Sequence, residues 1–184
     1  MRIISGTCRG RKLVQIQGKD IRPTSDRVRE ALFNIIGPGV LGMDVLDLFA
    51  GTGAFGLEAL SRGASSAVFV DTAQSSCDVI EKNISLCRMQ DSARLIRHDL
   101  ITAPLPDRLG HFDLIFMDPP YNKGYAETLL GKPGFADLLA PGGIIIIEQS
   151  FKETLANPLN SLDIYRQKKY SKTFVSFLRE SDNA

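Results

Sequence analysis

The sequence predicts an α/β fold built on a mostly parallel sheet, and three observations support this prediction. From residue 44 onward, short apolar runs alternate with helical patterns, as in doubly wound sheets. A glycine-rich turn, GTGAFG at residues 51–56, follows the first of these runs. Finally, the strand-like runs Asp163–Tyr170 and Thr173–Arg179 are separated by only two residues, a link that permits only an antiparallel hairpin.

The alternating region supplies five strands and two helices. The strand runs are continuous and apolar, which is typical of parallel strands covered by helices on both faces. We expect these strands at residues 45–49, 67–70, 93–97, 112–117 and 144–148. We expect helices from the glycine turn through Arg62 and over Ser75–Met89.

The segment before the sheet predicts a hairpin and a helix. Strands at Arg2–Ser5 and Arg11–Ile16 would flank the turn Gly6–Gly10. After a loop, a helix begins with Thr24 or Ser25 as its N-cap and ends at Gly37-Pro38-Gly39. We therefore expect two parts, a β-hairpin extension with its linker at residues 1–24 and a catalytic domain at residues 25–184.

Charge is unevenly distributed along the chain. Residues 1–30 contain eight basic and three acidic side chains, a net charge of +5, whereas the whole chain has +1 and the remainder therefore −4. This pattern is typical of a phosphate-binding arm on an acidic body. A solvated edge that resists aggregation is the alternative.

Composition argues against several other classes. The 184 residues contain no apolar run of about 18 residues and no apolar signal core, so we expect a cytoplasmic protein that spans no membrane. We expect it separately to be a monomer. Three cysteines fit reduced thiols in a cytosolic protein. Two histidines are too few and too far apart for a metal site.

The glycine turn predicts a nucleotide-cofactor site. Its G-x-G-x-x-G spacing lets the backbone turn sharply and lets a ligand approach closely. Asp71 ends the second strand, where a carboxylate can accept hydrogen bonds from ribose hydroxyls, an arrangement that excludes a 2′-phosphate. Asp99 ends the third strand, where it could meet an adenine amino group.

The turn itself favours S-adenosylmethionine (AdoMet) over NAD. Asp47 lies four positions before the first glycine, where it would attract the cationic amino-acid end of AdoMet and repel a pyrophosphate. We expect the cofactor-binding residues to be Asp47, Phe49, Gly51, Thr52, Gly53, Asp71 and Asp99.

Asp118-Pro119-Pro120-Tyr121, directly after the fourth strand, predicts the chemistry. An exocyclic amine of a base is a poor nucleophile because its lone pair is delocalised into the ring. The Asp118 carboxylate and the Pro119 carbonyl can accept its two N–H bonds and so free that lone pair. Tyr121 can stack on the base. A base in a duplex cannot reach such a site, so the target is unpaired or flipped out.

Several longer strings closely resemble the bacterial 16S rRNA guanine-N2 methyltransferase family. The strings are RPTSDRVREALFNII, DLFAGTGAFGLEALSRGA and DPPY, and MRIISGTCRGRKL looks like that family's basic N-terminal hairpin. The resemblance implies the class I AdoMet methyltransferase fold, a mostly parallel seven-stranded sheet ending in an antiparallel hairpin. It implies one guanine of the small ribosomal subunit, assembled or assembling, as substrate.

The resemblance also assigns roles to residues. It implies AdoMet at Asp47, Gly51, Gly53 and Asp71, and the target amine at Asp118, Pro119 and Tyr121. It implies rRNA phosphate contacts by basic residues of the N-terminal part, namely Arg2, Arg9, Arg11, Lys12, Arg22, Arg27 and Arg29.

The residues alone leave alternatives open. They indicate an amino methyltransferase acting on an unpaired base, but do not choose guanine over adenine or RNA over DNA. An adenine-N6 methyltransferase of DNA or RNA, a NAD-binding oxidoreductase and a non-catalytic rRNA-binding assembly factor are the competing hypotheses.

Overall fold

The computed structural model describes residues 1–16, 26–156 and 161–181 of the chain. These residues belong to two compact units, residues 1–98 and residues 99–184. The expected boundary near residue 24 falls outside the described residues, as do Thr24 and Ser25, the candidate N-caps of the first helix. No helix in the described ranges is long and apolar enough to cross a membrane.

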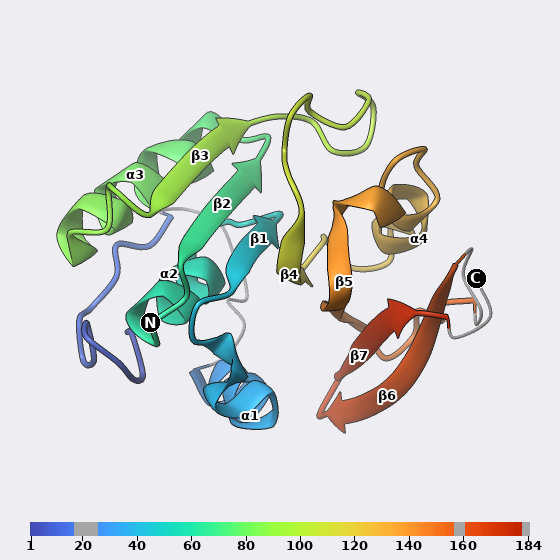
Figure 1. The fold of residues 1–184 in the computed structure, drawn as a ribbon, viewed down its shortest axis with the longest axis horizontal. Helices are drawn as coiled ribbons and strands as arrows, with labels where there is room; N and C mark the ends of the chain where they lie inside the picture. The colour runs from blue at the N-terminus through green and yellow to red at the C-terminus, as the bar shows by residue number, and fades with distance from the viewer. Residues whose placement is uncertain (17–25, 157–160, 182–184) are drawn as a thin grey trace. The chain divides into compact units, whose positions relative to one another are not determined.

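The first unit contains three parallel strands in the order β3-β2-β1, which lie side by side in Figure 1. The strands are β1 (Asp44–Leu48), β2 (Ser66–Asp71) and β3 (Ala93–Arg97). Its helices are α1 (Asp26–Ile36), the 3₁₀ turn η1 (Gly37–Val40), α2 (Ala54–Ser61) and α3 (Gln74–Cys87). As predicted, α1 ends where Gly37-Pro38-Gly39 begins.

Apolar side chains hold this unit together. Helix α2 packs against β1 and β2, and α3 packs against β2 and β3. Leu46, Phe69 and Ile80 are fully buried between these elements. The Asp47–Phe69 register places the ends of β1 and β2 together, so the loops after both strands lie at the same edge.

The second unit contains a parallel pair extended by an antiparallel hairpin, in the order β4-β5-β7-β6. The strands are β4 (Phe112–Met117), β5 (Leu139–Ser150), β6 (Leu162–Tyr170) and β7 (Thr173–Glu180). Two short helices, α4 (Tyr125–Leu130) and the 3₁₀ turn η2 (Ala136–Leu138), connect β4 to β5. The seven strands of the described ranges therefore confirm the predicted fold class, mostly parallel with an antiparallel C-terminal hairpin.

Strand β5 begins five residues earlier than predicted. Its first residue is Leu139, and the strand continues through Pro141-Gly142-Gly143, a string that looks like a turn in the sequence. The pairing with β4 shifts register between Phe112 and Leu114, which accommodates these residues as an irregularity.

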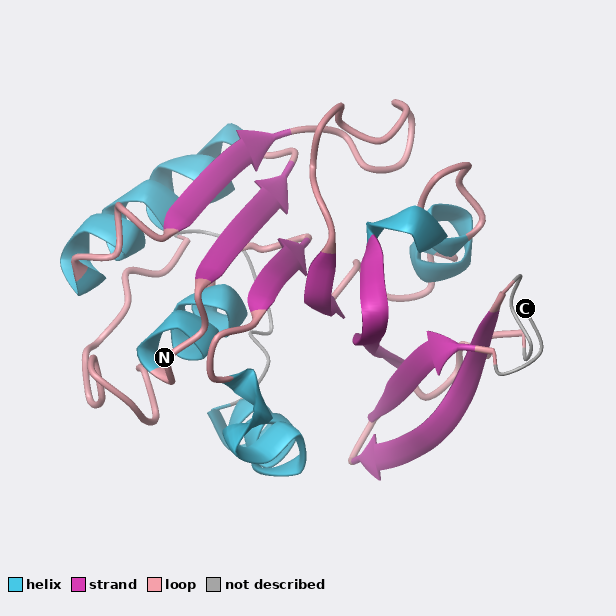
Figure 2. Cartoon of the chain, viewed as in Figure 1, coloured by secondary structure: helices cyan, strands magenta, loops and turns pink. Residues whose placement is uncertain are grey.

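The two predicted N-terminal strands are wrong as regular strands. Figure 2 shows residues 1–16, here called the N-terminal arm, as loop. The arm turns back on itself, but the antiparallel pairing is one isolated bridge, Arg2 with Lys12. The cause is competition for backbone donors, because several arm N–H groups bond to side chains of α2 and α3, as described below.

Candidate active site

The glycine turn after β1 has the backbone that its sequence predicts. Gly51 and Gly53 have φ values of 57° and 73°, in the left-handed region that favours glycine. A Cβ on Gly51 would meet only the carbonyl oxygen of Phe49, at 3.8 Å, so the turn is open at this point. Phe49 also has a positive φ, 57°, which is a strained conformation for an aromatic residue and is typical of functional sites.

Gly56, the third glycine, is required by packing. A Cβ on Gly56 would lie 2.4 Å from Cε1 of Phe69 on β2, well inside van der Waals contact. The third glycine therefore lets α2 approach the sheet closely, which is its usual role in this spacing.

Asp47 lies beneath the turn rather than on its surface. The residue is only 2% exposed, and its Oδ2 accepts a hydrogen bond from the Gly56 N–H at 3.0 Å. Burial raises the pKa of Asp47 to about 8, and the Asp71 carboxylate contributes to the rise, whereas the Gly56 N–H opposes it. A cation bound near the turn would favour the charged form of this carboxyl.

Asp71 connects the end of β2 to the turn. Oδ2 accepts from the Gly51 N–H at 2.8 Å, and Oδ1 accepts from the Ala73 N–H at 2.9 Å. Each carboxylate oxygen retains a second lone pair, so both can still accept from ribose hydroxyls. The residue is half-buried, which leaves it accessible to a ligand.

Asp99 is occupied by its own loop. Its Oδ1 accepts from the N–H groups of Ile101 and Thr102 at 2.9 and 3.1 Å, and Oδ2 accepts from the Thr102 hydroxyl at 2.6 Å. These bonds fix the loop after β3. Contact of Asp99 with a cofactor stays a prediction.

The motif Asp118–Tyr121 lies at the end of β4 in the second unit. Asp118 is half-buried and Pro119 is buried. The Tyr121 hydroxyl donates to Oε1 of Glu148 at 2.9 Å and lies 3.3 Å from Oγ1 of Thr173. Burial, with the Glu148 carboxylate nearby, raises the pKa of the phenol, so Tyr121 stays neutral and its ring is held in place.

A cavity of about 350 Å³ adjoins this motif. Its lining combines Pro119 and Asn122 from the loop after β4 with Gln149 at the end of β5 and with Lys152 and Glu153 in the following segment. The cavity is large enough for a nucleobase and offers both donors and acceptors.

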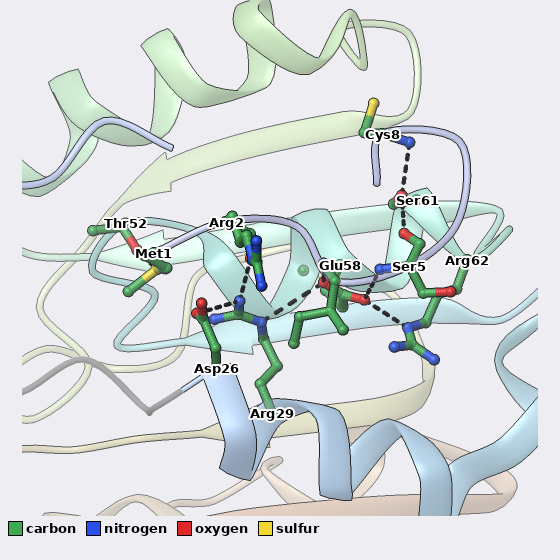
Figure 3. A network of polar contacts seen from close by, with 12 residues as sticks. Met1, Arg2, Ser5, Cys8, Asp26, Arg29, Thr52, Glu58, Ser61 and Arg62 are labelled. Carbon is green, nitrogen blue, oxygen red and sulfur yellow. Dashed lines mark hydrogen bonds and ion pairs between the residues drawn. The ribbon is translucent and has the colours of Figure 1, made fainter. Parts of the chain in front are cut away.

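Glu58 of α2 fixes the N-terminal arm to the rest of the first unit, as Figure 3 shows. Glu58 is fully buried, and its carboxylate accepts from the N–H groups of Ile4 and Ser5 at 2.7 and 3.0 Å. It also binds Nε of Arg62 at 2.7 Å. Ser61, one turn later, accepts from the Cys8 N–H and donates to the Ser5 carbonyl.

Arg29 belongs to the same network, so its predicted contact with rRNA phosphate is wrong. Arg29 is 1% exposed, and Nη2 donates to the Arg2 carbonyl at 2.5 Å and to Asp26 at 3.0 Å. Its Nε lies 3.7 Å from Oε2 of Glu58, an ion pair too long for a hydrogen bond. Helical spacing places this arginine on the buried face of α1, where it neutralises Glu58 (Figure 3).

The other predicted phosphate ligands in the described residues are on the surface. Arg11 is exposed, but one guanidinium nitrogen donates to the Leu86 carbonyl at 3.0 Å. The remaining exposed members are Arg2, Arg9, Lys12 and Arg27, whereas Arg22 lies outside the described residues.

The sequence profile of the family described as conserved hypothetical protein 95 matches residues 1–179. The chain belongs to this family.

Two relatives and one solved structure are similar to this chain over most of its length. The Bacillus subtilis protein YlbH is 35% identical over 98% of this chain and 99% of its own. Ribosomal RNA small subunit methyltransferase D of Haemophilus influenzae is 34% identical over 87% of this chain and 84% of its own. The solved structure of Escherichia coli yhhF has a TM-score of 0.82 and 30% identity, covering 98% of each chain. The predictions of the family and of a methyltransferase are thereby confirmed.

The sequence alone did not indicate four polar residues that the structure buries. Glu58 and Asn83 are fully buried in helices, and Glu148 and Gln149 are buried at the end of β5. Only Glu148-Gln149 had a sequence signal, because acid and amide directly follow the apolar run Ile144–Ile147 at a strand end. Among the described residues, no group of three or more potential ligands is placed to hold a metal ion.

Proposed function

We propose that this protein transfers a methyl group from AdoMet to the exocyclic N2 of a guanine in 16S rRNA of the small ribosomal subunit. The observation that supports this most is the end of β4, where Asp118 and Pro119 follow an apolar strand and Tyr121 is fixed by Glu148. Relatives named small subunit methyltransferases support the choice of rRNA.

The first unit fits the proposed cofactor. Asp47 lies beside the glycines, where an acid disfavours an anionic pyrophosphate. Asp47 and Asp71, which is bonded to the turn, instead suit the sulfonium and ammonium charges of AdoMet, and the gap at Gly51 leaves room for a ligand. Asp71 would hold the ribose, and Asp47 would provide the buried negative charge.

The second unit fits the proposed acceptor. Bound AdoMet supplies a methyl group on a cationic sulfur, and the departing thioether is neutral and needs no proton. The amine must therefore be made nucleophilic and held in line with that methyl group. Asp118 and the Pro119 carbonyl would accept its two N–H bonds, and Asp118 would stabilise the charge that develops on nitrogen. The methylated amine, now acidic, would then lose one proton to solvent.

Tyr121 has a positioning role in this scheme. Its neutral hydroxyl is committed to Glu148, so the ring cannot rotate away, and its face remains available for stacking on the base. The basic residues Arg2, Arg9, Arg11 and Lys12 would bind rRNA phosphates outside the site.

Three acceptors test the proposal against its alternatives. The protein is incubated with labelled AdoMet and with unmethylated small subunits, free 16S rRNA or duplex DNA, and the product nucleosides are identified by mass spectrometry. We expect N2-methylguanosine from the ribosomal substrates. If the product is N6-methyladenosine, the protein is an adenine-N6 methyltransferase instead. If the protein binds rRNA without methyl transfer, it is the non-catalytic assembly factor.

A further inference from the structure

Gln149 is a buried amide with one unused hydrogen-bonding atom. The residue is 2% exposed and lines the cavity beside Pro119. Its Nε2 donates to the Glu153 carbonyl at 3.0 Å. Its Oε1 is buried and has no hydrogen-bond partner among the described residues.

The orientation of this amide is fixed by its one bond. Exchanging the oxygen and nitrogen would place two carbonyl oxygens 3.0 Å apart, so Nε2 must face Glu153. The unused atom is therefore an acceptor. A buried acceptor without a donor is unfavourable, and a ligand in the cavity can supply the donor.

The ring atoms beside an exocyclic amine differ between purines. In guanine, N2 is flanked by N1, which carries a hydrogen and donates, and by N3, which accepts. In adenine, the positions flanking N6 present N1 and N7, and both accept. An acceptor beside the amine site therefore favours guanine and leaves adenine with two opposed acceptors.

We propose that Gln149 determines base specificity by accepting the N1–H of the target guanine through Oε1. This inference rests on the proposed function, because it requires the guanine amine to be held at Asp118 and Pro119. Two further residues that line the cavity support this role. Lys152 brings a donor to the lining for the guanine O6, and Glu153 holds the segment in place by accepting from the Ser150 N–H at 3.2 Å.

The test changes one base of the substrate and one residue of the protein. Small subunits are reconstituted with 16S rRNA carrying either guanine or 2,6-diaminopurine at the methylated nucleotide. Both bases have the N2 amine, but 2,6-diaminopurine lacks the N1–H and has an amine in place of O6. We measure kcat/KM for N2 methylation by wild type, Gln149→Met and Gln149→Glu.

We expect wild type to prefer guanine by roughly tenfold or more, the loss typical of one buried hydrogen bond. Gln149→Met should lower the guanine value by roughly tenfold and leave the diaminopurine value within about twofold, because no N1–H bond remains to lose. Gln149→Glu retains an acceptor oxygen but loses the donor to the Glu153 carbonyl, so it should lower both values and keep the guanine preference. Gln167→Met, the same change at an exposed site on β6, should alter neither value.

Two results would overturn the inference. If Gln149→Met lowers both values equally, Gln149 acts only in folding, and if it lowers neither, the residue does not contact the base. Both differ from failure of the proposed function, in which wild type itself would form no N2-methylated guanine.

Discussion

The side-chain amide of Asn83, on α3, donates a hydrogen bond to the main-chain carbonyl of Thr52 in the glycine turn, with an N–O distance of 2.9 Å. The same side chain binds both backbone groups of Val14 in the N-terminal arm, at 2.7 and 3.1 Å. Asn83 is fully buried. One residue therefore joins the arm to the proposed cofactor turn within the first unit.

Replacing Asn83 by Ala should weaken cofactor binding. The change removes the hydrogen bonds to the Thr52 carbonyl and to the backbone of Val14, each worth about 0.5–1.5 kcal/mol. Calorimetry with S-adenosylhomocysteine should show affinity reduced by roughly tenfold. Asn34→Ala, on the exposed face of α1, is the matched control and should bind normally. If both variants bind S-adenosylhomocysteine equally well, Asn83 does not support cofactor binding through the turn.

Replacing Arg29 by Met should reduce stability without changing the salt dependence of rRNA binding. The substitution leaves Glu58 buried with only part of its positive partners, and breaking a buried pair typically costs about 3–5 kcal/mol. Urea unfolding should show this loss, and filter binding of the folded variant should give the wild-type salt slope. A smaller salt slope than that of wild type would show that Arg29 does contact an rRNA phosphate.

Neutralising Arg9 and Lys12 should have the opposite effect. Both side chains are exposed on the arm, so stability should be almost unchanged. The log–log slope of subunit affinity against salt should decrease by about 0.7–0.9 for each phosphate that the arm no longer neutralises. An unchanged slope would show that the basic side chains of the arm are only solvated and contact no phosphate.

Asp47 should make the protein less stable as pH rises. The carboxyl has a pKa of about 8 when folded and 3.8 ordinarily, so between these values only the folded chain holds this proton. Stability from this group is complete below about pH 4, declines as pH rises and levels off above about pH 8. Asp47→Asn should lack this decline, as urea unfolding at several pH values will measure. Parallel pH profiles for both proteins would show that Asp47 is ionised throughout.

Much of the fold could be predicted because local and tertiary preferences agree in the sheet. Strands β3 and β4 have the predicted bounds, since each is a short segment between turns with apolar residues at its centre, Leu95-Ile96 in β3 and Leu114–Phe116 in β4. Helix α4 was not predicted, because it has only six residues and its N-cap is Gly124, whose φ is 66° and which offers no side-chain cap. Short helices of this kind depend on packing, which a local pattern does not reveal.

The site could be predicted only in part for a related reason. Glycine spacing and strand-end acids are local signals, so Asp47, Gly51 and Asp71 were recognisable. The roles of Glu58 and Asn83 depend on partners far along the chain, such as Ile4 and Val14. Helical spacing puts Arg29 on the face of α1 that carries Leu32 and Phe33, but only its contacts with Glu58 and the arm explain why a charged residue is buried there.

The most direct test of the proposed chemistry compares methyl transfer and cofactor affinity in Asp118→Ala. Single-turnover transfer to small subunits should be slower by roughly 10²–10³-fold, the loss typical of one preorganised electrostatic group. Affinity for S-adenosylhomocysteine should stay within about twofold of wild type, since Asp118 is not one of the proposed cofactor-binding residues, and all of these except Asp99 lie in the first unit. A variant that transfers methyl groups at the wild-type rate would contradict the account.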